Sequence, residues 1–466
     1  MHNTRRKFLK DTSLVSLGFL GLHLFAETGC NRLFEADFGS LSHREGDILS
    51  LPRGFSAKVI SRAGDKMSDG LYSPGSHDGM GLFPWGKDKV MLIRNHELMP
   101  GSLSQGPYGK NLELLEKVEK EKIYDLSRSS DKICMGGTTT FIYNEKSGKI
   151  ELEYLSLAGT VRNCSGGVTP WKSWITCEES PLRMGDPDYL LEKEHGYNFE
   201  VPATDKIGLT DPVPIKAMGR FVHESIAVHP ETGIVYQTED ESNGLIYRYL
   251  PDKTPRKVGD LHKGGRLQCL ALADWESADT RNRAELNTAR FPKNKPFDVF
   301  WIDLEEAKSP DNELRIIGHA KGAALFASGE GMSYGNGELF FTASYGGQIG
   351  AGQIFKYTPS IYEGQPREKE HPGKLELFLE SNDPEVFRYC DNVTIAPWGD
   401  IIICEDVADA RIIGITPKGK AYVIAKNIGY RESEFTGPVF STSGNTLFVN
   451  IQNPGLTLAI TGPWKS

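Results

Sequence analysis

The sequence lacks the features that define several large classes of protein. It has no excess of basic residues, since 53 Lys and Arg stand against 62 Asp and Glu, and the net charge of −9 disfavours nucleic-acid binding. The apolar stretch near the N-terminus, residues 14–26, is too short and too interrupted to span a membrane. No G-x-S-x-G elbow, Walker loop or strand-linked G-x-G-x-x-G fingerprint is present. The usual nucleotide-binding and serine-hydrolase signatures are therefore missing.

Cysteine is scarce and is not arranged as in a zinc site. None of the seven cysteines forms a C-x-x-C pair or a Cys/His zinc spacing. Disulfides are possible in an oxidising compartment, but the spacing predicts no particular pairing. Six cysteines follow the N-terminal region: Cys134, Cys164, Cys177, Cys269, Cys390 and Cys404.

Residues 1–30 have the pattern of a twin-arginine export signal, with paired arginines, Phe-Leu, a basic residue and a short apolar region. We therefore expect the twin-arginine translocase as a partner and a periplasmic or secreted location. Such export carries folded proteins, which favours a metal inserted before export. The segment ending at Cys30 resembles a lipoprotein cleavage box, although Glu27 replaces the usual aliphatic residue. A lipid anchor at Cys30 and simple cleavage nearby are the two alternatives.

A repeated unit is the most informative feature of the chain. Each copy has a polar residue, a short apolar stretch, a turn with Gly or Pro, a β-rich strand, and a polar or acidic cluster at the strand end. A second apolar strand often follows, so each unit resembles an antiparallel meander. The copies span residues 78–97, 164–179, 224–240, 330–344, 392–406 and 434–452.

Irregular repeats of this kind predict an all-β fold, a six-bladed β-propeller with short helical insertions at residues 103–132 and 273–292. Only 32 residues follow Glu434, too few for a complete blade, so residues 55–60 are expected to add the missing strand. The expected domains are the signal, residues 1–30, and a single propeller, residues 45–466, which we expect to be a monomer. The alternative is a chance set of hairpins in two sandwich domains.

Two positions of each unit would converge at one mouth of the axial channel, because the innermost strands of a propeller line that channel. So many carboxylates would destabilise the fold if they were buried without partners, and bound cations would compensate them. Carboxylates suit Ca²⁺, Mg²⁺ and Fe³⁺, and the thiol of Cys164 favours a redox-capable metal such as iron. The convergent set is Asp78, Asn95, Glu97, Cys164, Glu178, Glu179, Glu224, Glu239, Asp240, Glu330, Asn392, Glu405, Asp406, Glu434 and Asn450.

Each of these residues also has a purely structural interpretation. A strand-end acid is more often a solvated turn residue, and a single cysteine such as Cys164 is more often a small buried apolar residue. His96 and His223 could simply form hydrogen bonds within their blades. The recurrence of the position, and not any one residue, therefore supports the prediction of a metal site.

Several motifs together resemble the PhoX-type alkaline phosphatases, a family once described as a domain of unknown function, of which this chain would be a divergent member. The resemblance runs from about residue 45 to residue 464. It rests on the N-terminal signal and on residues 94–97 (RNHE), 135–140 (MGGTTT), 163–171 (NCSGGVTPW), 176–179 (TCEE), 219–224 (GRFVHE), 450–457 (NIQNPGLT) and 461–464 (TGPW).

The resemblance implies a six-bladed propeller that hydrolyses phosphate monoesters with two ferric ions, bridged by an oxo group, and several calcium ions. It implies that Cys164, Glu179 and Glu224 are metal ligands, that Glu330 joins iron and calcium, and that Asp240 is a further ligand. We add the strand-end acids Glu405 and Asp406 as metal ligands. We expect Glu179, Glu224 and Glu330 to be the catalytic residues.

One departure from the family pattern affects the expected activity. The family has an arginine two residues before the last glutamate, where it contacts the phosphoryl oxygens, and this chain has Ser328. A serine lacks the charged, forked contact of an arginine, and its loss typically costs about 10²- to 10³-fold in rate. We expect Asn95, Arg220 and Ser328 to bind the small phosphorylated substrate, with Arg220 as one possible replacement for the missing charge.

Two other functions remain open at the level of sequence. One is a calcium-dependent propeller lactonase or esterase, in which His96 or His223 would be the base. The other is a non-catalytic, metal-bearing propeller that binds a ligand or partner at the cell envelope, an option that the missing arginine favours. Iron content separates the phosphatase from the lactonase, and turnover of a phosphomonoester separates it from the binding protein.

Overall fold

The fold consists almost entirely of β-strands, as the repeats predicted. The computed structural model describes residues 38–465, and the predicted signal and Cys30 lie outside them. Within that range the one α-helix is α2 (Leu314–Ala320), and no helix has the length and apolar character that crossing a membrane requires. The six cysteines of these residues are free thiols.

The strands form five hydrogen-bonded sheets. Two sheets have four strands, β4 (His77–Pro84), β5 (Lys89–His96), β6 (Gly136–Asn144) and β7 (Lys149–Thr160), and β24 (Phe435–Phe440), β25 (Thr446–Ile451), β26 (Leu456–Thr461) and β3 (Ser56–Arg62). A third has β8 (Asn163–Val168), β9 (Ser173–Glu178) and β10 (Asn198–Pro202). A fourth has β20 (Cys390–Ile395), β21 (Ile401–Glu405), β22 (Arg411–Ile415), β23 (Ala421–Asn427), β2 (Leu49–Pro52) and β1 (Leu41–Ser42).

The fifth sheet has nine strands and consists of two meanders joined at their outer edges. The first meander is β11 (His223–Val228), β12 (Val235–Glu239), β13 (Ile246–Pro251), β14 (Gly265–Leu272) and β15 (Phe297–Leu304). The second is β16 (Gly329–Gly335), β17 (Glu338–Ala343), β18 (Gln353–Thr358) and β19 (Lys374–Glu380). Only two residue pairs, Phe297 with Leu375 and Asp298 with Lys374, join β15 to β19.

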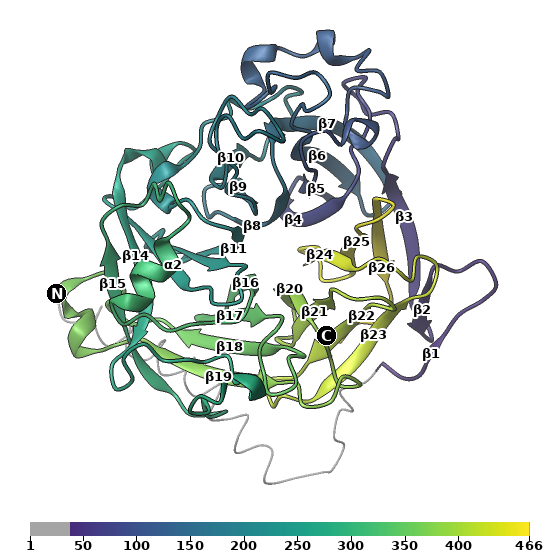
Figure 1. The fold of residues 1–466 in the computed structure, drawn as a ribbon. Helices are drawn as coiled ribbons and strands as arrows, with labels where there is room; N and C mark the ends of the chain where they lie inside the picture. The colour runs from purple at the N-terminus through teal and green to yellow at the C-terminus, as the bar shows by residue number, and fades with distance from the viewer. Residues whose placement is uncertain (1–37, 466) are drawn as a thin grey trace, which may run out of the picture. The chain divides into compact units, whose positions relative to one another are not determined.

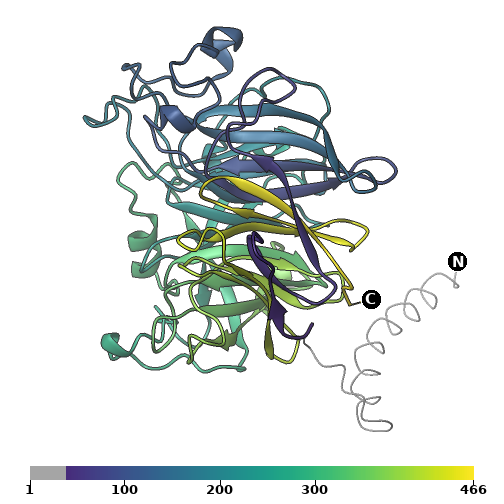
Figure 2. The same cartoon turned by 90° about the vertical axis from the view of Figure 1, so that its right-hand side faces the viewer.

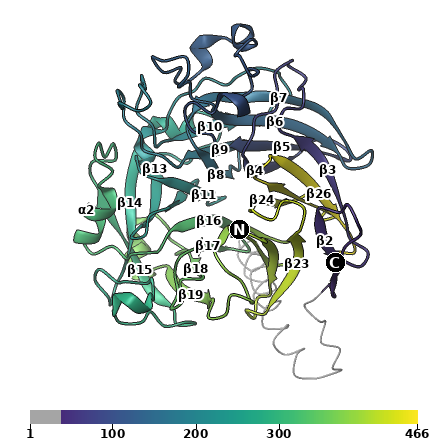
Figure 3. The ribbon, with the colours of Figure 1, turned by 45° about the vertical axis from the view of Figure 1, so that its right-hand side comes forward.

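The sheets stand around a common axis in a propeller-like arrangement (Figure 1). Six strands, here called the inner strands, surround that axis, and each contacts the next: β4, β8, β11, β16, β20, β24 and again β4. The arrangement closes through the pairing of β3 with β26, for example Val59 with Leu458, and Figures 2 and 3 show these two strands side by side. The predicted closing strand at residues 55–60 is therefore confirmed.

Apolar residues fill the spaces between neighbouring sheets. β21, with the sequence IIICE, is buried along its whole length because both of its faces are covered by other sheets. This explains why several strands are continuous apolar runs and do not alternate polar and apolar residues. The predicted insertions contain only short 3₁₀ turns: Leu103–Gln105, Leu115–Lys117, Lys120–Lys122 and Ala284–Leu286.

Every inner strand contains a β-bulge near its start, after the first residue pair in five of them and after the second pair in β24. In β4, for example, the pairing passes from His77 opposite His96 to Met80 opposite Arg94, so two residues stand against one. The same shift occurs in β8, β11, β16, β20 and β24. In a regular strand, successive side chains point to opposite faces of the sheet. A bulge interrupts this alternation, so it changes the direction of one side chain in each inner strand.

The bulges of adjacent inner strands touch and form a continuous ring, here called the throat. Polar contacts join them, for example Met332 N to Ser225 Oγ at 3.1 Å and Gly437 N to Asn392 Oδ1 at 2.5 Å. On one side of the throat lies an axial cavity of about 370 Å³. The second residue of each bulge lines that cavity: Gly79, Ser165, Ser225, Gly331, Asn392 and Pro438.

The throat leaves no room for a side chain at Gly331, which gives a first prediction. A Cβ there would lie 2.5 Å from the main-chain N of Val393 and 2.7 Å from Asn392 Cα, and main-chain atoms cannot move aside cheaply. We expect Gly331→Ala to lower the free energy of unfolding by about 1–3 kcal/mol, the usual cost of overpacking. Chemical denaturation measures this effect.

The matched control is Gly335→Ala in the same strand, where the only close contact of the new Cβ is the terminal Cδ1 of Ile395 at 2.6 Å. That methyl group can rotate away, so the control should cost clearly less. Equal losses of stability for the two variants would contradict the close contact that the throat requires.

Candidate metal centre

In five of the six inner strands the first residue of the bulge lies on the side of the throat away from the axial cavity and carries a metal-binding type of side chain. These residues are Asp78, Cys164, Glu224, Glu330 and Asp391, each the second residue of its strand. In β24 the acid, Glu434, directly precedes the strand. Four of the second strands are followed directly by a carboxylate: Asp240 follows β12, Asp406 follows β21, and Glu97 and Glu179 follow β5 and β9.

These side chains form three overlapping groups whose ligand atoms lie within 4.8 Å of one another: Asp78, Glu97 and Cys164; Cys164, Glu179 and Glu224; Glu224, Glu330 and Asp391. Cys164 belongs to two groups and so does Glu224, so the groups form one continuous chain of donors. We call these seven residues the axial cluster.

The axial cluster is electrostatically unfavourable without bound cations. Burial raises the pKa of Glu224 well above its ordinary value, and the carboxylates of Glu179 and Glu330 raise it further. Burial and Asp406 raise the pKa of Asp391 to about 8. Burial and nearby acids also raise the pKa of the Cys164 thiol. The protein alone therefore favours protonated forms of groups that would bind metal when deprotonated.

The environment of the Glu224 carboxylate indicates whether these residues fit a metal. Both of its carboxylate oxygens are buried, and neither has a hydrogen-bond partner among residues 38–465. A buried carboxylate without partners is strongly unfavourable, and native proteins rarely keep one. The donor set, carboxylates with one thiol, suits hard or borderline cations. The residues present therefore fit a metal centre.

One cation contacts the axial cluster. Arg162 directly precedes β8, and its Nη2 lies 2.7 Å from Glu97 Oε1 and 2.8 Å from Glu179 Oε2. Burial lowers the pKa of the Arg162 guanidinium, but Glu179 and Glu97 outweigh burial and raise the pKa above its ordinary value. Within residues 38–465, no other basic side chain forms an ion pair with the axial cluster.

Comparison with known proteins identifies the family. The sequence model of the family described as Alkaline phosphatase PhoX matches residues 36–455. This chain belongs to the PhoX family. The match covers most of the chain, including every residue of the axial cluster.

One solved structure supports the fold. The structure of Pseudomonas fluorescens PhoX in complex with vanadate, a transition state analogue, is 17% identical, with a TM-score of 0.64 over 89% of this chain and 96% of that one. A luciferin-regenerating enzyme is 11% identical over 88% of this chain and 96% of that one, but its TM-score of 0.40 is too low to support an argument. No curated protein matches the sequence.

Most of the residues predicted to bind metal come together in this PhoX chain. Cys164, Glu179, Glu224 and Glu330 all belong to the axial cluster. Asp240 lies beside it, since, after burial, its charge is a further cause of the raised pKa of both Glu179 and Glu330. Burial raises the pKa of Asp406, and the acids Glu97 and Asp240 raise it further. Asp406 is therefore close enough to the axial cluster for its carboxylate to be affected by the same negative charges.

The structure places two predicted residues in other roles. The Glu405 carboxylate accepts hydrogen bonds from the Arg411 guanidinium at 2.6 and 2.8 Å and from the main-chain N–H groups of Arg388 and Arg411. The Arg220 guanidinium is buried and donates to five main-chain carbonyls: those of Pro181, Leu182, His195, Ser309 and Pro310. Glu405 is therefore held away from the axial cluster, and Arg220 ties loops together.

The other two predicted substrate-binding residues lie close to the cluster but contact protein groups. The Asn95 amide donates to the carbonyls of Cys164 and Ser165, and its oxygen accepts a hydrogen bond from Trp174 Nε1. Asn95 therefore holds the bulge that presents Cys164. Ser328 is nearly buried, and its main-chain N–H donates to the carbonyl of Glu241.

The two histidines considered as lactonase bases are buried and fully hydrogen-bonded. His96 contacts the carbonyl of Gly75 and the hydroxyl of Thr139, and His223 contacts the carbonyl of Gly219 and the amide of Asn198. Burial lowers the pKa of both imidazoles. Neither ring has a free nitrogen to accept a proton from a substrate, so the structure gives no support to a lactonase.

Sequence analysis missed two residues of the site. Asp391 was passed over for its neighbour Asn392, because the sequence does not show which residue the bulge turns toward the axis. Arg162 was missed because it lies between two motifs and not inside one. Its position two residues before Cys164 was the available signal.

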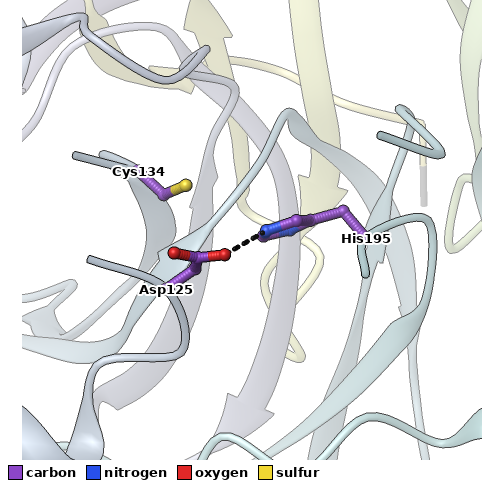
Figure 4. A group of neighbouring side chains, drawn as sticks. All are labelled: Asp125, Cys134 and His195. Carbon is purple, nitrogen blue, oxygen red and sulfur yellow. Dashed lines mark hydrogen bonds and ion pairs between the residues drawn. The ribbon is translucent and has the colours of Figure 1, made fainter. Parts of the chain in front are cut away.

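A second group of metal-ligand types, Asp125, Cys134 and His195, lies outside the axial cluster (Figure 4). All three side chains are buried. His195 Nδ1 lies 2.6 Å from Glu178 Oε1, and Nε2 lies 3.3 Å from Asp125 Oδ2. Both ring nitrogens face carboxylates, so both must carry a proton, and no lone pair remains for a metal. We call the protonated His195 and its two carboxylate partners, Glu178 and Asp125, the ion bridge.

The ion bridge gives a second prediction. Burial lowers the pKa of His195, but Glu178 and Asp125 outweigh it and raise the pKa well above 6.5. We expect His195→Asn to cost about 3–5 kcal/mol in unfolding free energy, because two buried carboxylates lose their counter-charge. The contribution of His195 is complete below about pH 6.5 and declines as the pH rises through the folded-state pKa.

Urea denaturation at pH 6 measures this loss. His371→Asn, at an exposed histidine, is the control and should change stability little. If His195→Asn were as stable as this control, the imidazolium assignment would be wrong.

Proposed function

We propose that this protein is a metal-dependent phosphatase that hydrolyses phosphate monoesters. The observation that carries the proposal is the Glu224 carboxylate, buried without a partner between two donor groups in a chain of the PhoX family. Such a site stabilises bound cations, and cations are what the transfer of an anionic phosphoryl group requires.

We further propose iron and calcium as the metals. The thiol of Cys164 supports iron in the groups that contain it. The group of Glu224, Glu330 and Asp391 offers only carboxylate oxygens, which supports calcium. Glu179, Glu224 and Glu330 would then be the catalytic carboxylates through the metals that they hold.

When bound, the metals supply the positive charge that phosphoryl oxygens and an activated water need. The chain's own residues fix the donors. Thr238 and Thr342 donate to the carbonyls of Glu330 and Asp391 at 2.5 and 2.6 Å, and Ser344 donates to Glu330 Oε1 at 2.7 Å. The axial cavity is lined by the second residues of the bulges and by none of the seven donors, so we propose that substrate enters from the cluster side.

The remaining expectations belong to the same proposal. We propose that the two meanders of the nine-stranded sheet count as separate blades, which makes a six-bladed propeller of residues 45–466; the six bulged inner strands support this count. We propose export of a monomer through the twin-arginine translocase to the periplasm or outside the cell, with a lipid anchor at Cys30 as the alternative to cleavage.

The proposal is tested on natively produced protein by elemental analysis and by turnover of p-nitrophenyl phosphate with and without calcium. We expect iron and calcium to co-purify with the protein, and chelation to abolish turnover. Metal-loaded protein that hydrolyses no phosphomonoester would instead support the non-catalytic, metal-bearing alternative.

A further inference from the structure

Arg162 has an unusual position at the mouth of the axial cluster. Its φ of 45° lies in the left-handed region, which is unfavourable for a side chain of this size. The surrounding main chain holds it there, because Arg162 N donates to the carbonyl of Leu98 and its own carbonyl accepts from Glu179 N. Strained residues that are fixed in this way are frequent at functional sites.

Three other inner strands have a left-handed residue at the same position, two residues before the first bulge residue. These are Ser76 before Asp78, Ser328 before Glu330 and Tyr389 before Asp391, with φ of 42°, 53° and 45°. None of the three carries a charge. Arg162 is therefore the cationic member of a repeated structural position around the mouth.

The guanidinium of Arg162 is only half used by the protein. Nε and Nη2 contact Glu97 and Glu179, whereas Nη1 has no protein partner among the described residues. The side chain is 35% exposed, so this end of the fork reaches solvent. Both carboxylate partners also belong to the axial cluster, and cations bound there would compete with the guanidinium for the same oxygens.

We propose that Arg162 is the phosphoryl-binding residue of this site, and that its guanidinium donates to the non-bridging oxygens of the substrate phosphate. A planar fork of N–H donors matches two phosphoryl oxygens, which a lysine or a hydroxyl group cannot do. Its attachment directly before β8 keeps the fork next to Cys164 and Glu179. This inference rests on the proposed function and specifies how the substrate is held.

The test compares Arg162→Gln and Arg162→Lys with the wild-type holoenzyme. We expect Arg162→Gln to lower kcat/KM for p-nitrophenyl phosphate by about 10²- to 10³-fold and to weaken inhibition by orthovanadate in parallel. Arg162→Lys should recover only part of both effects. Metal content, measured by elemental analysis, should stay unchanged in both variants.

The matched control is Arg315→Gln. Arg315 also pairs with strand-end acids, Glu239 and Glu241, but these do not belong to the axial cluster. We expect wild-type kinetics and vanadate inhibition from this variant.

Two results would overturn the inference while the phosphatase proposal stands. One is an Arg162→Gln enzyme with unchanged kcat/KM and vanadate inhibition, and the other is loss of metal in step with activity, which would assign Arg162 to holding Glu97 and Glu179. If the metal-loaded wild-type protein itself neither turned over the ester nor bound vanadate, the proposed function would fail, and this inference with it.

Discussion

Replacing Glu224 by Gln should have opposite effects on activity and on the stability of the metal-free protein. Glu224 belongs to two donor groups, so its loss should release metal and lower phosphatase activity by about 10³-fold, equivalent to several kcal/mol of transition-state stabilisation. In the presence of a chelator the same variant should unfold at a higher temperature than the wild type. The reason is that a buried carboxylate with two unpartnered oxygens has been neutralised.

The matched control is Glu363→Gln. Glu363 is also buried, but its Oε1 lies 2.6 Å from Arg248 Nη1. Neutralising this satisfied acid should lower stability and leave metal content unchanged. The assignment of Glu224 as a metal ligand would not survive a Glu224→Gln protein that keeps its full metal complement.

Metal removal should also reverse the usual effect of pH on stability. Burial raises the folded-state pKa of Asp78, Glu179, Glu224, Glu330, Asp391 and Glu434, with mutual repulsion as a further cause. In the unfolded chain these groups titrate near pH 4. The folded state therefore holds more protons, and its stability must fall as the pH rises.

The measurement is urea denaturation of chelated protein between pH 6.5 and 8.5. The lower limit matters because the buried His77, His96 and His223 have lowered pKa values and oppose the trend below about pH 6.5. A single carboxyl group that stays protonated over these two pH units lowers stability by about 3 kcal/mol. Metal-loaded protein should keep only the smaller decline due to His195. The same steep decline with and without metal would contradict an axial metal centre.

The sequence was sufficient for the strands and for the closure of the fold. The second apolar strands that were expected to follow the polar clusters occur, for example, at Ile246–Pro251, Gln353–Thr358 and Arg411–Ile415. Apolar runs and turns determine such elements locally. The short pairing between β15 and β19, which merges two meanders, depends on how outer edges meet in space and leaves no pattern in the sequence.

The candidate site was only partly predictable, for a specific physical reason. Counting acids at the two repeated positions found Glu179, Glu224 and Glu330. It could not separate them from Glu405, whose partner Arg411 comes from the next strand. The bulge in β20 determines that Asp391, and not Asn392, lies with the metal donors. The position of this bulge depends on the neighbouring inner strands, so it cannot be predicted from the local sequence. Which acids lack a partner is a property of the assembled ring.

The pairing of β3 with β26 sets the order of events during synthesis. β3 leaves the ribosome among the first strands and β26 is the last, so neither can find its partner until translation is nearly finished. The donors of the axial cluster lie on five inner strands and directly after two second strands, spread between Asp78 and Asp391, so no early fragment can bring them together. Tight metal binding would then require that translation is nearly complete and that β3 has paired with β26.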